Sequence, residues 1–354
     1  MKIAVTADLH LSTYQAHPER YHALVNILNY MLKDRISTII IAGDLFNEFH
    51  RNYSEFEALC KQEEYRNIHF IIVPGNHDSK ITNKLIVADN VEVISEELVK
   101  TFSSAEAKFL FLPYKKEKTM GDIIAGFAEE FFNNKWILIG HGDWIGSMAQ
   151  PNPLEPGTYM PLSRTDIERF KPSRVILGHI HKPLDIGIIH YPGSPCPLDI
   201  TETGKRRFLV IDSEDCSVIS HPLDSDFIFF DESLVVIPVK DEEKYLKAQI
   251  KSKIEKWDIK KSERSKVIVR IKVRGYTSDK RRLMEIIKNS FQEFAFYQNE
   301  EPDISDVYTS DDLDRAEIAD RVSREIEKLE WIESPEEPSR EEMLLEALHG
   351  IYGD

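Results

Sequence analysis

The chain has 354 residues, of which 42% are hydrophobic and 30% charged, values typical of a globular protein with about two domains. Its three cysteines, Cys60, Cys196 and Cys216, show no Cys-x-x-Cys spacing, which argues against a disulfide framework or a zinc knuckle. We expect a cytoplasmic protein, because an apolar strand begins at Lys2, where a signal peptide would lie, and no apolar run is long enough to cross a membrane.

The formal net charge of −16 would by itself argue against a nucleic-acid partner, since phosphate binding depends on Lys and Arg. The charge is unevenly distributed, however. Residues 240–288 hold 17 basic and 8 acidic residues, a balance of +9, whereas residues 300–354 hold 5 basic and 19 acidic residues, a balance of −14. Separated basic and acidic segments suggest a different partner for each.

Residues 1–221 have the pattern of one α/β domain. Five short apolar segments each lead directly into residues that can bind a metal. These are 3–7 before Asp8 and His10, 38–43 before Asp44, 69–73 before Asn76, His77 and Asp78, 136–140 before His141, and 174–178 before His179 and His181. Because the carboxyl ends of neighbouring parallel strands meet in one crevice, we expect these side chains to converge.

The connections in this domain are expected to be helices and one long loop. A helix should begin near Pro18, a second should cover residues 54–65, and a third should run from about 121 to 132. Residues 142–162 are rich in Gly, Pro and polar groups, which predicts a surface loop near the site.

Residues 222–301 have the pattern of a smaller α+β domain, with strands at 234–239 and 266–273 and helices at 241–257 and 279–291. Alternation in the second strand places the basic residues on one face. They are Lys266, Arg270, Lys272 and Arg274. Such a stripe is either the solvated face of a half-buried sheet or a binding surface, and the strand alone does not decide between the two.

Residues 302–354 are acidic and predict two amphipathic helices. The first covers about 311–333, with Ile318, Val322, Ile326 and Leu329 in an apolar stripe. The second opens with a capping box at Ser339 and ends at Gly350. These helices either fold back onto their own domain or dock on another chain.

The residue types at the five strand ends suit hard or borderline divalent cations, which bind carboxylate, imidazole and amide groups without thiolates. Asp8, His10 and His181 can hold one ion, while Asn76, His141 and His179 can hold a second. Asp44 is the natural bridging carboxylate. We keep His77 for catalysis, either as a proton donor to the leaving oxygen or as a transition-state contact, with its ring oriented by Asp78.

The motifs Asp8-x-His10, Gly43-Asp44, Gly75-Asn76-His77-Asp78, Gly140-His141 and Gly178-His179-Ile180-His181 resemble, in order, those of the calcineurin-like metallophosphoesterases. The resemblance implies an α/β fold in which a β-sandwich is flanked by helices in four α/β/β/α layers. It also implies a two-metal site, most often occupied by Mn²⁺ in nucleases of this type. Asp44 would then be shared, with Asp8, His10 and His181 on one ion and Asn76, His141 and His179 on the other.

Two further stretches are similar to the Mre11/SbcD DNA-repair nucleases. They are residues 177–182 followed by 191–194, and the loop that carries Tyr14, His17 and Arg20. This similarity implies a nuclease domain at 1–221, a DNA-facing cap at 222–301, and a tail at 302–354 that binds a Rad50/SbcC-type coiled-coil ATPase. It also implies a homodimer. The DNA contacts would include Tyr14, His17 and Lys182 beside the basic stripe, and Asn47 stands where many relatives have His or Asp in an auxiliary role.

Two alternatives remain. A phosphodiesterase of the same fold that acts on a small phosphoester would explain the strand-end residues but not the basic and acidic segments. A non-catalytic scaffold of the same fold should have lost ligands, whereas this chain retains the full set.

Overall fold

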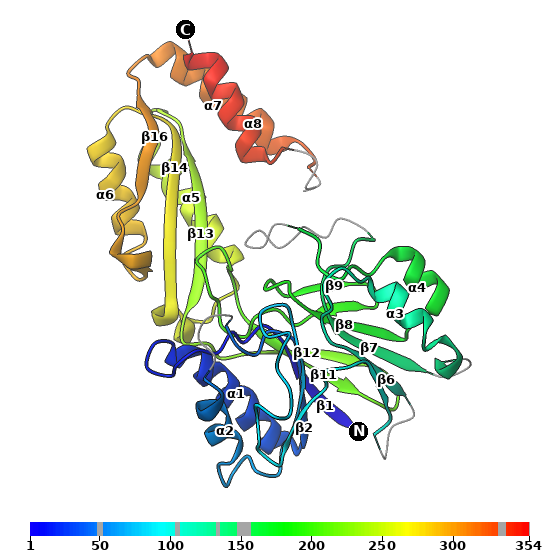
Figure 1. The fold of residues 1–354 in the computed structure, drawn as a ribbon. Helices are drawn as coiled ribbons and strands as arrows, with labels where there is room; N and C mark the ends of the chain where they lie inside the picture. The colour runs from blue at the N-terminus through cyan, green and yellow to red at the C-terminus, as the bar shows by residue number, and fades with distance from the viewer. Residues whose placement is uncertain (48–51, 103–106, 132–134, 147–156, 332–337, 354) are drawn as a thin grey trace. The chain divides into compact units, whose positions relative to one another are not determined.

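The computed structural model describes residues 1–47, 52–102, 107–131, 135–146, 157–331 and 338–353. The chain forms two compact units, one made of Met1–Leu198 and Lys205–Asp226, the other of Asp199–Gly204 and Phe227–Asp354 (Figure 1). In the described part of the chain, every helix is too short or too polar to span a bilayer.

The first unit contains two six-stranded sheets. In the first sheet β1, β2, β3 and β4 are parallel, and β11 is antiparallel to both β1 and β12. In order across the sheet, its strands are β12 (Val218–Pro222), β11 (Arg207–Asp212), β1 (Lys2–Thr6), β2 (Thr38–Ala42), β3 (His69–Val73) and β4 (Val91–Val93). β2 is buried throughout, as expected for the β-branched run Thr38–Ala42 in a parallel sheet covered on both faces.

The second sheet has a parallel centre formed by β6, β7, β8 and β10. In order, its strands are β5 (Leu98–Lys100), β6 (Lys108–Leu112), β7 (Trp136–His141), β8 (Arg174–Gly178), β10 (Ile189–Tyr191) and β9 (Leu184–Ile186). β9 and β10 form an antiparallel hairpin.

The two sheets face each other across an apolar core. Ile40 and Ile71 of the first sheet belong to the same buried cluster as Phe111 and Ile139 of the second. The outer face of the second sheet packs against α3 (Met120–Ala125) and α4 (Arg164–Phe170). Figure 1 shows α1 (Pro18–Asp34) and α2 (Tyr53–Cys60) beside the first sheet. The expected β-sandwich flanked by helices is therefore confirmed.

The helix expected over 121–132 is shorter than its apolar pattern suggested. α3 ends at Ala125, and a separate 3₁₀ turn, η1, covers Ala128–Phe131. Residue 132 and residues 147–156 of the loop expected at 142–162 lie outside the described residues, although Trp144 and Leu162 form a bridge between the two ends of that loop.

The second unit is built on a sheet whose central strand is β14 (Val267–Thr277). β13 (Ile228–Val236), β15 (Ala295–Phe296) and β16 (Asp303–Thr309) all pair with β14 in parallel. One face of the sheet packs on α5 (Glu242–Lys256) and α6 (Lys280–Ser290). The remaining short elements are η2 (Lys261–Lys266) and η3 (Tyr297–Asn299).

Two differences from the sequence pattern concern this sheet. β13 begins six residues before the strand expected at 234, and β16 was not expected at all. β16 starts just after position 302, where the sequence suggested a domain boundary, and it extends the sheet along β14.

The C-terminal helices are α7 (Leu313–Lys328) and α8 (Arg340–Tyr352). The expected capping box at Ser339 is present, but α8 continues past Gly350. Leu344, Leu345 and Leu348 are buried in one cluster with Val235 and Ile237 of the sheet region. Of the two arrangements left open by the sequence, α8 therefore shows the first, in which the helix packs on its own unit.

Candidate metal centre

The predicted ligands lie in loops that directly follow their strands. The loops after β1 and β2 continue the pairing of those strands, since the amide of His10 donates to the Asp44 carbonyl at 2.9 Å. Asp8, His10, Asp44 and His179 all adopt positive φ values, of 54°, 45°, 50° and 95°. Such conformations are costly for non-glycine residues and cluster at functional sites.

Glycines allow these loops to approach one another. A Cβ atom at Gly75 would lie 2.2 Å from Asp44 Oδ1, and one at Gly43 would lie 1.9 Å from His141 Nδ1. A Cβ at Gly178 would lie 2.0 Å from the Ala42 carbonyl oxygen. Gly43, Gly75 and Gly178 thus leave room for the ligands that the sequence places beside them.

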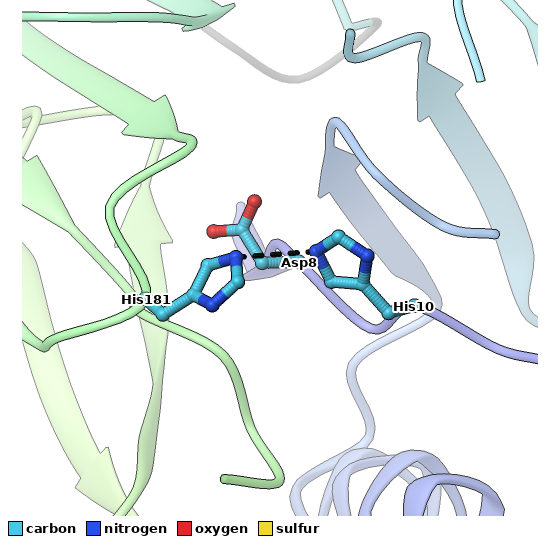
Figure 2. A group of neighbouring side chains, drawn as sticks. All are labelled: Asp8, His10 and His181. Atoms are coloured by element: carbon cyan, nitrogen blue, oxygen red, sulfur yellow. Dashed lines mark hydrogen bonds between the residues drawn. The ribbon is translucent and has the colours of Figure 1, made fainter. Parts of the chain in front are cut away.

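Asp8, His10 and His181 form the first ligand group. Their candidate ligand atoms lie within 4.8 Å of one another, and all three residues are buried. Figure 2 shows the two imidazoles facing each other beside the carboxylate, with 3.2 Å between their Nε2 atoms. Residues 171 positions apart in the sequence have therefore been brought to one point, as predicted.

Asp44 connects this group to the second. Its Oδ2 atom lies 3.8 Å from His10 Nε2 and 3.3 Å from His141 Nε2. His141 Nε2 is also 2.7 Å from Asn76 Oδ1, while its Nδ1 faces the Ala42 carbonyl at 3.2 Å. His141 Nε2 thus faces both Asp44 and Asn76, and the Asp44 carboxylate lies between the imidazoles of His10 and His141.

His179 lies beside this second set, with its ring centroid 5.5 Å from that of His141. Its backbone amide donates to Asp8 Oδ1 at 2.9 Å. Its Nε2 atom lies 3.6 Å from Asp143 Oδ1, and the ring of Tyr159 lies 4.6 Å from its own. Sequence reasoning did not identify Asp143 or Tyr159. The sequence hinted at a role for Asp143 only through its place two residues after His141.

His77 reaches the same centre. Its backbone amide donates to Asp44 Oδ1 at 3.0 Å, and its ring centroid lies 4.8 Å from that of His10. Asp78 is fully buried and accepts hydrogen bonds from the amides of Gly75 at 2.7 Å and Phe46 at 3.2 Å. These bonds tie the loops after β2 and β3 together and give Asp78 a structural role, while the orientation of the His77 ring by Asp78 stays a prediction.

The charges of the centre fit divalent cations. Asp8 Oδ2 and Asp44 Oδ2 are both buried; among the described residues no hydrogen-bond donor reaches Asp8 Oδ2, and Asp44 Oδ2 faces the imidazole of His141 at 3.3 Å. Buried carboxylate oxygens of this kind are costly unless a cation compensates them. Together with the neighbouring imidazoles and the Asn76 amide, they match the ligand preferences of hard and borderline metals.

The pKa values reflect this crowding. Burial raises the pKa of Asp8 to about 6 and, with the charge of Asp44, that of Asp78 to about 6 as well. Burial also acts on Asp44, but the imidazoles of His141, His10 and His77 outweigh it and hold the Asp44 pKa below its ordinary value. Burial alone would lower the pKa of His141, yet the Asp44 carboxylate raises it to about 10.

Residues 1–197 match the family described as calcineurin-like phosphoesterase. The chain belongs to this family. It is also 26% identical over 260 residues to the SbcD subunit of the nuclease SbcCD from Staphylococcus epidermidis, which covers 62% of this chain and 68% of that protein. A solved archaeal phosphodiesterase covers 63% of this chain and is itself covered completely, at 14% identity and a TM-score of 0.34, too low for a structural argument.

Two buried arginines of this phosphoesterase hold ligand-bearing loops. Arg206 Nη1 donates to the His181 carbonyl at 3.0 Å, and Arg20 Nη1 donates to the His10 carbonyl. Arg20 lies in the first turn of α1 and belongs to the stretch that suggested the nuclease resemblance, whereas no sequence pattern had singled out Arg206. In the sequence it stands between Lys205 and Arg207 and has the pattern of a basic surface.

The residues expected to contact DNA in the phosphoesterase unit are mostly exposed. The Tyr14 hydroxyl lies 3.0 Å from His22 Nε2, and His22 Nδ1 lies 2.7 Å from Asp226 Oδ2. His17 Nδ1 lies 2.9 Å from Glu19, and Lys182 is exposed. Asn47 is half-buried, and its backbone amide donates to the Leu11 carbonyl at 3.1 Å.

The basic stripe of the second unit has the alternation expected from the sequence, because Val267, Val269, Ile271 and Val273 are buried and Lys272 is exposed. The stripe is partly neutralised. Arg270 forms an ion pair with Asp231, and Arg274 donates to Ser233 Oγ at 3.0 Å. Lys272 pairs in register with Asp303 of β16. Lys266, expected on the same strand, is instead the last residue of η2 and is half-buried.

Proposed function

We propose that this phosphoesterase is a Mn²⁺-dependent DNA nuclease and the nuclease subunit of a complex with a Rad50/SbcC-type ATPase. The observation that carries the proposal is the meeting of Asp8, His10 and His181 around one point beside Asp44, which in turn contacts His141. The similarity to the SbcCD nuclease subunit supports DNA as the substrate.

The proposed ligands divide into two sets that share Asp44. Asp8, His10 and His181 would hold one ion, and Asn76, His141 and His179 would hold the other. When bound, a divalent pair neutralises phosphate charge and favours in-line hydrolysis of a phosphodiester. The chain's own contribution is to fix these side chains, and the strained loops with their glycine contacts serve that purpose.

His77 is the proposed proton donor to the leaving oxygen. It is half-buried at the edge of the ligand cluster, and its backbone is tied to Asp44. An imidazolium in this position can protonate the leaving sugar oxygen as the P–O bond breaks, so that a hydroxyl leaves in place of the poor leaving group alkoxide. The site therefore supplies an acid as well as a place for cations.

The deciding experiment incubates purified protein with end-labelled linear duplex DNA and Mn²⁺, and in parallel with bis-p-nitrophenyl phosphate. The proposal predicts metal-dependent DNA cleavage that disappears in Asp44→Asn and in chelator. Hydrolysis of the small diester without any cleavage of DNA, alone or with the ATPase, would favour the small-substrate alternative. No hydrolysis of either substrate would favour the scaffold alternative.

The proposed partner surface is the outer side of α7. Ala316, Ala319 and Ser323 of this helix are buried, whereas Leu313, Ile318 and Leu329 are 81%, 50% and 45% exposed. Exposed apolar side chains on the outer side of an acidic helix suit docking on a helical partner such as a coiled coil.

The partner surface is tested by Ile318→Asp combined with Leu329→Asp. We expect this variant to lose co-purification with the ATPase while it retains DNA cleavage, and Glu325→Ala serves as the exposed control on the same helix. Deletion of residues 303–354 is a poor substitute, because it would also remove β16 from the sheet. Retained binding by the double variant would contradict this assignment.

A further inference from the structure

We propose that Asp143 is a positioning residue that orients the His179 imidazole for metal binding. The inference rests on the proposed two-metal centre and assigns a role to a carboxylate outside the ligand set. Asp143 Oδ1 lies 3.6 Å from His179 Nε2, and the two side chains are 10% and 1% exposed.

The reason lies in the two ring nitrogens. A histidine that binds a metal does so through one nitrogen, and the proton on the other is usually held by a carboxylate or carbonyl. Asp143 faces Nε2, so it favours the tautomer with the proton there and leaves Nδ1 for the metal. A separation of 3.6 Å is that of an ion pair and longer than a hydrogen bond, and we expect rotation of the ring to shorten it when an ion is bound.

The other histidine of the second ligand set is held in a comparable way. His141 Nδ1 faces the Ala42 carbonyl at 3.2 Å, which leaves Nε2 directed at Asp44 and Asn76. Each imidazole of this set thus has an oxygen acceptor facing one nitrogen. For His179 that acceptor is Asp143.

The backbone holds Asp143 in place through the far end of its loop. Asp143 Oδ2 accepts a hydrogen bond from the Tyr159 amide at 2.7 Å. The Asp143 amide donates to the Tyr159 carbonyl at 2.8 Å, and the Leu162 amide donates to the Asp143 carbonyl at 2.8 Å. Oδ2 of Asp143 therefore accepts a hydrogen bond from the loop backbone, while Oδ1 faces the His179 imidazole.

Tyr191 of β10, which lies on the far side of β8 from β7 in the same sheet, fixes the same turn. Its hydroxyl donates to the Gly142 carbonyl at 3.0 Å and accepts from the Trp144 amide at 2.8 Å. Gly142 and Trp144, on the two sides of Asp143, are thereby hydrogen-bonded to β10, where Tyr191 is fully buried. A carboxylate on a turn held in this way can fix the ring that it faces.

Asp143→Asn separates positioning from a merely structural role. The asparagine oxygen can still accept from the Tyr159 amide, but its NH₂ group would face Nε2 and favour the tautomer that carries the proton on Nδ1. The readout is Mn²⁺ binding by equilibrium dialysis and calorimetry, on the full chain. Asp166→Asn is the matched control, because Asp166 also bonds backbone and side chain, at Ser163, where it caps α4.

We expect wild type and Asp166→Asn to bind two ions with equal affinity. Asp143→Asn should bind one ion normally and the other about 10–100-fold more weakly, as is usual when an outer partner of a metal ligand is lost. If the Asp143→Asn variant binds both ions as tightly as wild type does, the inference is overturned. The Asp143 carboxylate would then only stabilise its loop through the Tyr159 amide. If wild type binds no ion, the proposed function itself fails, and the two failures are distinguishable.

Discussion

The Nε2 atoms of His10 and His181 lie 3.2 Å apart, although 171 residues separate these histidines in the chain. At this distance two imidazole lone pairs repel each other unless a proton or a cation lies between them. Burial, together with the nearby His181, His77 and Arg20, lowers the pKa of His10 well below its ordinary value despite the attraction of Asp44. A shared cation satisfies both neutral rings, and the predictions below follow from that arrangement.

Gly75→Ala should displace Asp44 and impair the centre without touching a ligand. The new Cβ would lie 2.2 Å from Asp44 Oδ1 and 2.5 Å from the Asp44 amide, and the backbone atom cannot give way easily. We expect a loss of about 1–3 kcal/mol in unfolding free energy and weaker Mn²⁺ binding. Gly350→Ala is the matched control, since nothing lies within 4 Å of its new Cβ and it sits in α8. Equal stability and metal binding in the two variants would disprove the close-approach argument.

His77→Ala should lower the rate of DNA cleavage by about 10²–10⁴-fold while both ions remain bound. The reason is the loss of the proton donor to the leaving sugar oxygen. Hydrolysis of bis-p-nitrophenyl phosphate should fall much less, because p-nitrophenolate leaves without a proton. Equal losses on both substrates would assign His77 to another role, and full activity on DNA would remove it from the mechanism.

Asp8→Asn should stabilise the metal-free protein in a pH-dependent way. Burial raises the folded-state pKa of Asp8 from 3.8 to about 6, so between these values the folded state retains a proton that the unfolded state has lost. Wild type therefore loses stability relative to the variant as the pH rises through this window. The amide of His179 can still donate to the asparagine oxygen.

In chelator, chemical denaturation should give similar stabilities near pH 4 and a variant more stable by about 2–3 kcal/mol near pH 8. Saturating Mn²⁺ should reverse the order, because the variant lacks a ligand. An Asp8→Asn protein less stable than wild type at both pH values in chelator would contradict the proposed cost of the buried carboxylate.

Lys272→Glu should weaken binding of duplex DNA and reduce the slope of log K against log salt by about 1. Lys272 is the exposed member of the stripe, whereas Arg270 is already paired with Asp231 and should contribute less when replaced. Filter binding at several salt concentrations measures the effect, with Lys33→Glu as an exposed control on α1. An unchanged slope would show that the basic stripe on β14 does not contact DNA.

The fold of the first unit and the convergence of its strand-end side chains could be predicted because the signals are local. Each ligand follows an apolar run such as Thr38–Ala42, and parallel strands gather their carboxyl ends at one edge. Asp143 and Arg206 could not be predicted in the same way. Their roles depend on which loop lies beside His179 or His181, and this is decided by tertiary packing.

The second unit shows the same limit. β14 alternates apolar and polar residues and was predicted, whereas β16 is exposed at most positions and has the acidic composition of a loop. Only Val307 of β16 is buried, and the strand exists because β14 offers it unpaired backbone groups. The apolar residues predicted to share one face of α7 likewise have different environments. Ile326 packs against the cluster that contains Val235 and Ile237, whereas Ile318 is exposed.

The central claim is that Asp44 is shared by two divalent ions, and counting bound Mn²⁺ tests it most directly. Equilibrium dialysis of the full chain at saturating Mn²⁺ should give two ions per wild-type chain and at most one per Asp44→Asn chain. The asparagine oxygen can still accept from the His77 amide, so the loop should keep its fold. A wild-type chain that binds no Mn²⁺, or an Asp44→Asn chain that binds two ions as tightly as wild type, would contradict the account.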